Sequence, residues 1–141
     1  MDESEFAVKY LVACRRVEVT QPVSRSEYTL HDVAYAFDIP SDREWPARID
    51  ELWLFVRFYN GEGTKRFTLS VFWLAPPTGG EVDIAHYDLV VRFPPDTIGL
   101  NWAWNVSRLQ FPGQGRYVFR LSDDENGELL ADEHVLIRRE V

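Results

Sequence analysis

The chain has 141 residues, of which 45% are hydrophobic and 27% charged, a composition typical of a folded domain and unlike that of a disordered chain. Fifteen basic against 23 acidic residues give a formal net charge of −8, which disfavours general binding to a phosphate backbone. Cys14 is the only cysteine, so an intrachain disulfide and a thiolate metal cluster are excluded. We therefore expect a single domain over residues 1–141 that is stabilised by neither a disulfide nor a thiolate metal cluster.

From the pattern of the sequence we expect neither a secretory signal nor a membrane span. Residues 1–5 are acidic where a secretory signal would be basic, and no apolar run approaches the roughly 18 residues of a membrane span. We expect a cytoplasmic protein with no membrane partner and no nucleic-acid partner. Nothing near Cys14 in the sequence supplies a base to activate its thiol, so this residue is predicted to be a small buried hydrophobe.

The first third of the chain predicts two strands and a loop. Residues 6–19 are expected to form one long strand, or two strands with a bulge near Cys14 and Arg15 where the alternation loses phase. Residues 28–39 contain a second extended run, and a hairpin between the two runs is the simplest arrangement. Residues 40–48 hold two prolines and predict a loop, in which Trp45 is expected to cap one end of the core.

The central stretch, residues 51–74, predicts two strands around which the fold is organised. Residues 52–59 are apolar on both faces, whereas residues 66–74 alternate as a half-buried strand does. Residues 60–63, Asn-Gly-Glu-Gly, predict a hairpin between them. One face of the first strand carries Leu52, Leu54, Val56 and Phe58, and the other carries Trp53, Phe55, Arg57 and Tyr59.

Four further strands follow from the same alternation. They are predicted at residues 86–93, 100–106, 117–121 and 132–141, after a break at residues 76–80. The Asn126-Gly127 pair predicts a hairpin before the last of them. About eight strands at short spacing and no convincing amphipathic helix indicate an all-β protein. The predicted fold is an antiparallel β-sandwich of immunoglobulin-like or similar Greek-key topology.

Patterns of catalytic or metal-binding residues are not recognisable. His31, His86 and His134 lie on separate predicted strands without the short spacing of metal ligands. Residues 122–133 match an EF-hand calcium loop at several positions, but Ser122 stands where the first Asp belongs. The flanks also read as strands, so a plain acidic hairpin is favoured over a calcium site. We expect a protein that is not an enzyme and has no cofactor.

Aromatic side chains supply the candidate binding residues. An uncovered second face of the central strand would be an exposed aromatic patch, typical of an interface with another protein or with a second copy in a homodimer. The leading hypothesis is a non-catalytic interaction module that uses this face or its end loops. The alternative is a small-ligand or carbohydrate-binding domain using Trp73, Trp102 and Trp104 on an open concave face. The tentative binding residues are Trp53, Phe55, Arg57, Tyr59, Trp102 and Trp104.

Several segments together show a resemblance that covers nearly the whole chain. The segments are residues 14–17, 30–37, 52–58 followed by 61–63, 109–112, 115–119 and 127–131. They resemble a family of uncharacterised bacterial proteins, domain of unknown function 6941, whose members are single β-sandwich domains. The resemblance implies a bacterial protein with the same fold, and it transfers no catalytic residue because none is assigned in that family.

Overall fold

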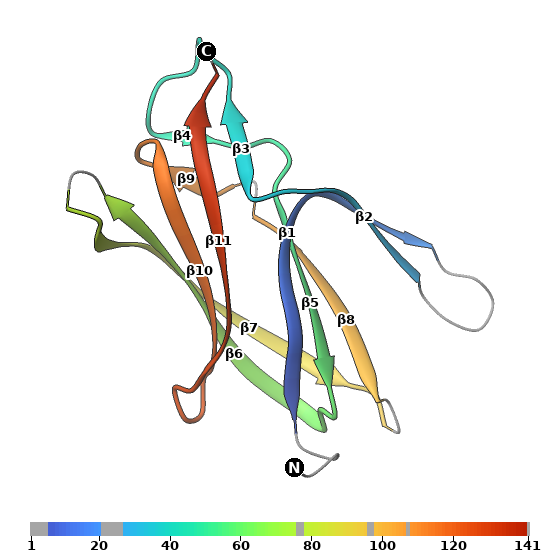
Figure 1. Ribbon diagram of the computed structural model, residues 1–141. Helices are drawn as coiled ribbons and strands as arrows, with labels where there is room; N and C mark the ends of the chain where they lie inside the picture. Colours follow the sequence, from blue (N-terminus) through green and yellow to red (C-terminus); the bar gives the residue numbers. More distant parts are fainter. Residues whose placement is uncertain (1–5, 21–26, 76–77, 96–97, 107, 141) are drawn as a thin grey trace.

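A computed structural model describes residues 6–20, 27–75, 78–95, 98–106 and 108–140, which form a two-layer β-sandwich (Figure 1). The all-β class is therefore confirmed. None of the described residues belongs to a helix with the length and hydropathy needed to cross a bilayer. The strands are β1 (Ala7–Thr20), β2 (Glu27–Val33), β3 (Ala36–Ile39), β4 (Ala47–Arg48), β5 (Trp53–Tyr59), β6 (Gly63–Ala75), β7 (Gly80–Phe93), β8 (Gly99–Asn105), β9 (Gln110–Phe111), β10 (Gly115–Asp123) and β11 (Leu129–Arg139).

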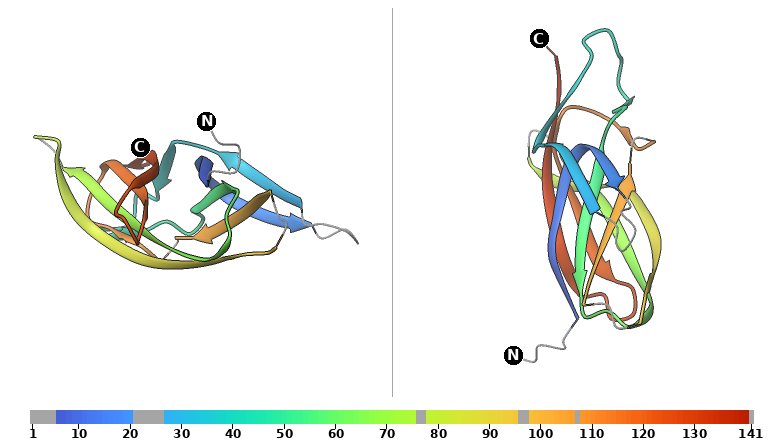
Figure 2. Two further views of the ribbon diagram at one scale, coloured as in Figure 1. Left: turned by 90° about the horizontal axis from the view of Figure 1, so that it is seen from below. Right: turned by 90° about the vertical axis from the view of Figure 1, so that its right-hand side faces the viewer.

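Two sheets make up the sandwich. Sheet A has the order β2-β1-β5-β8, and sheet B has the order β3-β11-β10-β6-β7; β4 and β9 form a separate short pair. The two sheets face each other, as the two turned views show (Figure 2). Neighbouring strands are antiparallel except β3 and β11, which run parallel, so sheet B is mixed. The extended run at residues 28–39 is divided, because β2 stays in sheet A while β3 crosses to sheet B.

The hairpin predicted across residues 60–63 is wrong. β5 lies between β1 and β8 in sheet A, whereas β6 lies between β10 and β7 in sheet B, so the connection crosses between the layers. A strand that is apolar on both faces suits a central position with partners on both edges, and β1 and β8 provide them. Gly61 in the crossover is buried against Phe93, whose ring leaves no room for a Cβ atom.

Other connections predicted from the sequence agree with the structure. The hairpin between the first two runs is confirmed by the antiparallel pairing of β1 and β2. The acidic turn joins β10 and β11, with Gly127 at φ 71°. The break at residues 76–80 lies in a β6–β7 hairpin, although residues 76 and 77 are outside the described part. The bulge lies between Val8 and Tyr10, not near Cys14, where the pairing with β2 keeps its register.

Large apolar side chains from both sheets fill the core. Trp45 packs against it as expected, with the Arg139 guanidinium 5.5 Å above the indole ring. Tyr117, at the start of β10, donates its hydroxyl to the carbonyl oxygen of Gly113, four residues upstream, as in the tyrosine corner of immunoglobulin-like sandwiches. The largest fully buried side chains are Tyr117, Phe37, Phe58, Phe67, Phe111, Phe119, Ile39, Leu52, Leu69, Leu121, Ile137 and Val71.

Candidate functional site

The pairing register of sheet A decides which aromatic side chains face outward. Leu54 lies opposite Trp104 and Val56 lies opposite Trp102, and partners in an antiparallel pair point to the same side. Since Leu54 and Val56 are core residues, both tryptophans point inward with them. The alternate residues of β5 therefore share the outer face of sheet A, as the sequence predicted. These residues are Trp53, Phe55, Arg57 and Tyr59.

Part of this outer face is covered by the neighbouring strands. The Phe55 ring is only 4% exposed. Tyr10 of β1 stacks on it with ring centroids 5.9 Å apart, and Tyr28 of β2 lies 5.5 Å away. Tyr10 itself remains 38% exposed, and Trp53 is half-buried. Phe55 is thus packed beneath other rings. Among the residues around it that are at least partly exposed are Lys9, Tyr10, Trp53, Arg57 and Tyr59, called the outer patch below.

A polar cluster lies at one end of the outer patch. Arg57 donates from Nε to the Tyr59 hydroxyl over 3.0 Å and from Nη1 to the Asn101 side-chain oxygen over 2.9 Å. Lys9 Nζ approaches the same hydroxyl at 3.5 Å, and both cations lie over the Tyr59 ring. The hydrogen bond from Arg57 lowers the pKa of Tyr59, and Lys9 acts in the same direction. The cluster therefore stabilises negative charge at this point of the surface.

The two cations of the cluster have no acidic partner in the described part of the chain. The ion pairs formed there involve other residues. Lys9 and Arg57 instead share a neutral hydroxyl and an amide oxygen. Among the described residues, Lys9 and Arg57 are thus neighbouring cations without a carboxylate, a local concentration of positive charge in a protein whose formal net charge is −8.

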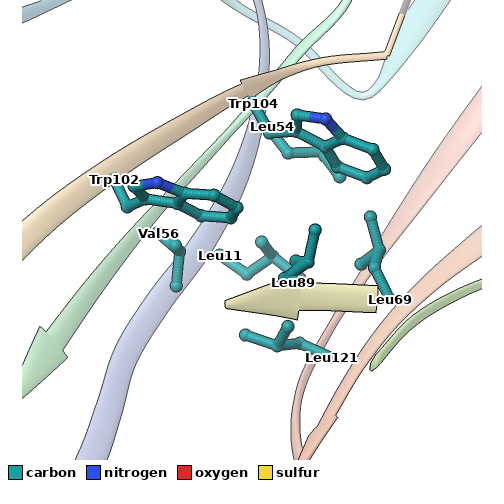
Figure 3. A pocket seen from close by; sticks show the side chains of 8 residues that line it. All are labelled: Leu11, Leu54, Val56, Leu69, Leu89, Trp102, Trp104 and Leu121. Atoms are coloured by element: carbon teal, nitrogen blue, oxygen red, sulfur yellow. The ribbon is translucent and has the colours of Figure 1, made fainter. Parts of the chain in front are cut away.

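Trp102 and Trp104 line a narrow space between the sheets (Figure 3). Its volume is about 10 Å³, roughly one water-sized probe sphere, so a sugar ring does not fit. The Trp104 ring meets the Tyr87 ring edge-on with centroids 4.6 Å apart. Trp73 lies elsewhere, stacked on Tyr117 at 6.0 Å. The three tryptophans do not form one open concave face, and their contacts favour a packing role.

The three histidines stay apart, on β2, β7 and β11. Each has its own carboxylate neighbour, and no group of three potential ligands that could hold a metal occurs among the described residues. Cys14 is fully buried, and burial raises the pKa of its thiol, which suits the expected packing role. The histidine pairs, with N···O distances, are His31 with Glu18 at 3.1 Å, His86 with Asp83 at 3.4 Å and His134 with Asp132 at 3.8 Å.

The acidic turn at residues 122–133 uses its side chains locally. Asp123 accepts a hydrogen bond from the backbone N–H of Glu125, and Asn126 accepts one from that of Glu128. Asp124 accepts a hydrogen bond from the Thr68 hydroxyl of β6. The side chains that would have been calcium ligands thus stabilise the turn.

Sequence reasoning missed the residues from neighbouring strands that complete the outer patch or pack against this face of sheet A. Lys9 and Tyr10 come from β1, Asn101 comes from β8 and Tyr28 comes from β2, so their proximity depends on strand order. One local signal existed: adjacent Lys9 and Tyr10 interrupt the apolar alternation of residues 6–12, and the bulge lies there.

No known protein family matches the chain, and no curated protein matches it either, so the bacterial family resemblance stays a prediction. Among solved structures the chain is similar to a β-D-glucoside glucohydrolase from Trichoderma reesei, with TM-score 0.48 and 9% identity over 94% of this chain and 19% of that one. It is also similar to an immunoglobulin-like protein from Pseudomonas aeruginosa, with TM-score 0.45 and 13% identity over 98% of this chain and 100% of that one.

A third structure is the β-glucosidase of Chaetomella raphigera, with TM-score 0.47 and 8% identity over 94% of this chain and 18% of that one. This chain therefore spans about a fifth of each glucosidase. At such identities no activity or substrate is carried over to it.

Proposed function

We propose that this chain is a cytoplasmic, non-catalytic interaction module whose outer patch binds a segment of a partner protein that presents a carboxylate. The observation that carries the proposal is the convergence of Lys9 and Arg57 on the Tyr59 hydroxyl without an acidic partner among the described residues. A carboxylate placed there would gain charge-assisted hydrogen bonds, which are about twice as strong as neutral ones.

The composition of the outer patch supports a protein partner. Trp, Tyr and Arg are the residue types that dominate the binding energy of protein interfaces. Asn101 holds the Arg57 guanidinium in place, which reduces the side-chain entropy that binding would otherwise cost. Tyr10, which lies opposite Arg57 in the β1–β5 register, supplies partly exposed apolar surface beside the cations, and Trp53 supplies more of it four residues away along β5. The patch therefore fits a segment in which an acidic residue stands near an aromatic or aliphatic one.

Peptide selection tests the proposal directly. A random peptide library displayed on phage is selected against the wild-type protein, and binders are measured by calorimetry. Selected peptides should contain Asp or Glu beside an apolar residue, and their affinity should fall at least tenfold for Arg57→Gln and decline with added salt. Arg116→Gln is the matched control, because Arg116 is an exposed cation on β10 of the other sheet.

Two results would contradict this function. If the selected peptides lack acidic residues, Lys9 and Arg57 do not bind a carboxylate. If the peptides bind wild type and Arg57→Gln with equal affinity, their binding site lies elsewhere on the protein. Trp53→Ala distinguishes self-association through the outer patch from binding of a different protein. If the outer patch forms a homodimer, light scattering shows a dimer for wild type and a monomer for this variant.

A further inference from the structure

β7 forms the free edge of sheet B. It pairs with β6 on one side, and no backbone hydrogen bond from another described strand reaches its other side. The strand is 14 residues long and runs along the outer boundary of the molecule in both turned views (Figure 2). The β6–β7 register is unbroken from Ala85 to Phe93. A long regular edge of this kind is a template for one more strand.

The exposed side chains of this edge have a symmetric pattern. Val90 is 54% exposed on the outer face of sheet B. Asp88 and Arg92, two residues away on either side and on the same face, are also exposed. Neither forms an ion pair in the described part of the chain, whereas Arg120 with Glu81 and Arg138 with Asp38 do so on the same sheet. The edge thus carries an apolar centre between two opposite, unpaired charges.

We infer that β7 pairs antiparallel with β7 of a second copy about a twofold axis at Val90. In that register Val90 meets its own counterpart, and Asp88 of each copy faces Arg92 of the other. Leu89 and Val91 likewise face each other on the inner side. Opposed side chains in such a pair are about 4.5–5.5 Å apart at Cβ, close enough for the ion pairs.

The charge pattern of β7 indicates that the strand pairing with it belongs to a second copy of this chain. A twofold axis exchanges positions 88 and 92, so opposite charges at these two positions make the edge complementary to itself. The pairing extends from Tyr87 to Phe93, and Pro94 ends it because proline has no N–H to donate. The outer patch lies on sheet A and stays free, so this inference is independent of the proposed function.

Charge exchange provides the test, with solution mass measured by light scattering over a concentration series at low salt. Wild type should dimerise. Asp88→Arg alone places Arg against Arg, and Arg92→Asp alone places Asp against Asp, so each should weaken the dimer at least tenfold. The double variant D88R/R92D restores opposite charges and should recover the dimer. A mixture of the two single variants should form a heterodimer, since every facing pair is then complementary.

Controls make each result decisive. Arg116→Asp changes the net charge as Arg92→Asp does, but on an inner strand of sheet B, and should leave the dimer unchanged. All altered positions are exposed, and circular dichroism verifies that each variant is folded. A strictly monomeric wild type would overturn the inference. So would single variants that dimerise as wild type does, or a dimer that only Trp53→Ala dissociates, which would assign self-association to the outer patch.

Discussion

The carboxylate of Glu133 accepts a hydrogen bond from the backbone N–H of Ala13 over 3.0 Å and so joins β11 of sheet B to β1 of sheet A. The β1–β2 ladder begins at Cys14, and beyond it the Ala13 carbonyl oxygen accepts a hydrogen bond from the backbone N–H of Ala34. The ladder has no acceptor for the Ala13 N–H at this end, and Glu133 supplies one. An inward-pointing charge is one way in which proteins close a sheet edge. Burial raises the pKa of Glu133, and the hydrogen bonds from Ala13 and His134 oppose that rise only in part.

Glu133→Gln should change how stability depends on pH. Because the folded pKa is raised, the contribution of Glu133 is full below the unfolded value near 4.5 and is lost as pH rises through the folded pKa. Glutamine keeps an acceptor for Ala13 and has no charge to bury. We expect its stability relative to wild type to increase from pH 4 upward and then level off, as measured by urea unfolding. Parallel stability curves across this range would contradict the assignment.

Tyr117→Phe should remove the hydrogen bond to Gly113 while keeping the buried ring. The expected loss is about 1–2 kcal/mol in the free energy of unfolding, since the Gly113 carbonyl is left without this partner. Burial raises the pKa of Tyr117 to about 12. Wild type should therefore lose stability between about pH 10 and 12, and the variant should lack that component. Measuring the free energy of unfolding of both proteins at pH 9 and pH 11 tests this contribution of Tyr117. An equal loss of stability in the two proteins between these pH values would contradict it.

Gly61→Ala should show how tightly the crossover between the sheets is packed. An added Cβ atom would lie 2.3 Å from Cδ1 of Phe93, so the core must shift. Overpacking of this kind costs about 1–3 kcal/mol. Gly80→Ala is the matched control, because its Cβ would lie 3.5 Å from the Thr78 hydroxyl oxygen. Thermal unfolding of the two variants should differ clearly, and equal melting temperatures would mean that the crossover is looser than described.

Trp104→Ala should destabilise the fold without affecting a binding surface. The indole packs on Tyr87 and on the leucines of the narrow space between the sheets, so its removal should cost about 3 kcal/mol in urea unfolding. Trp53→Ala, on the outer face, should cost much less. A stable Trp104→Ala protein that no longer bound the selected peptides would instead make this tryptophan a ligand contact.

Alternation predicted faces well because side-chain direction is a local property of a strand. It placed Leu54 and Val56 on one side of β5 and Arg57 and Tyr59 on the other, as the structure has them. It also placed Trp102 and Trp104 together. Whether a face is core or surface depends on what covers it, and Phe55 is covered by rings from β1 and β2 that local patterns cannot assign.

The pairing of strands could not be predicted from local sequence patterns, because it depends on segments far apart along the chain. Residues 60–63 have the composition of a hairpin turn, yet Gly61 serves a crossover because β5 and β6 find their neighbours in different sheets. The cation cluster at Tyr59 needs residues from β1 and β8, far away along the chain. Such contacts follow from strand order, which the turn and strand signals do not encode.

The parallel pairing of β3 with β11 bears on the order in which a ribosome can complete this protein. Asp38 and its partner Arg138 are 100 residues apart along the chain. During synthesis about ninety further residues must be made before β11, the neighbour of β3 among the described strands of sheet B, is complete. This long loop raises the entropic barrier to closing the sheet. Until then the backbone groups of β3 lack their partners in β11, so this edge of sheet B can form only after the C-terminal strand has been made.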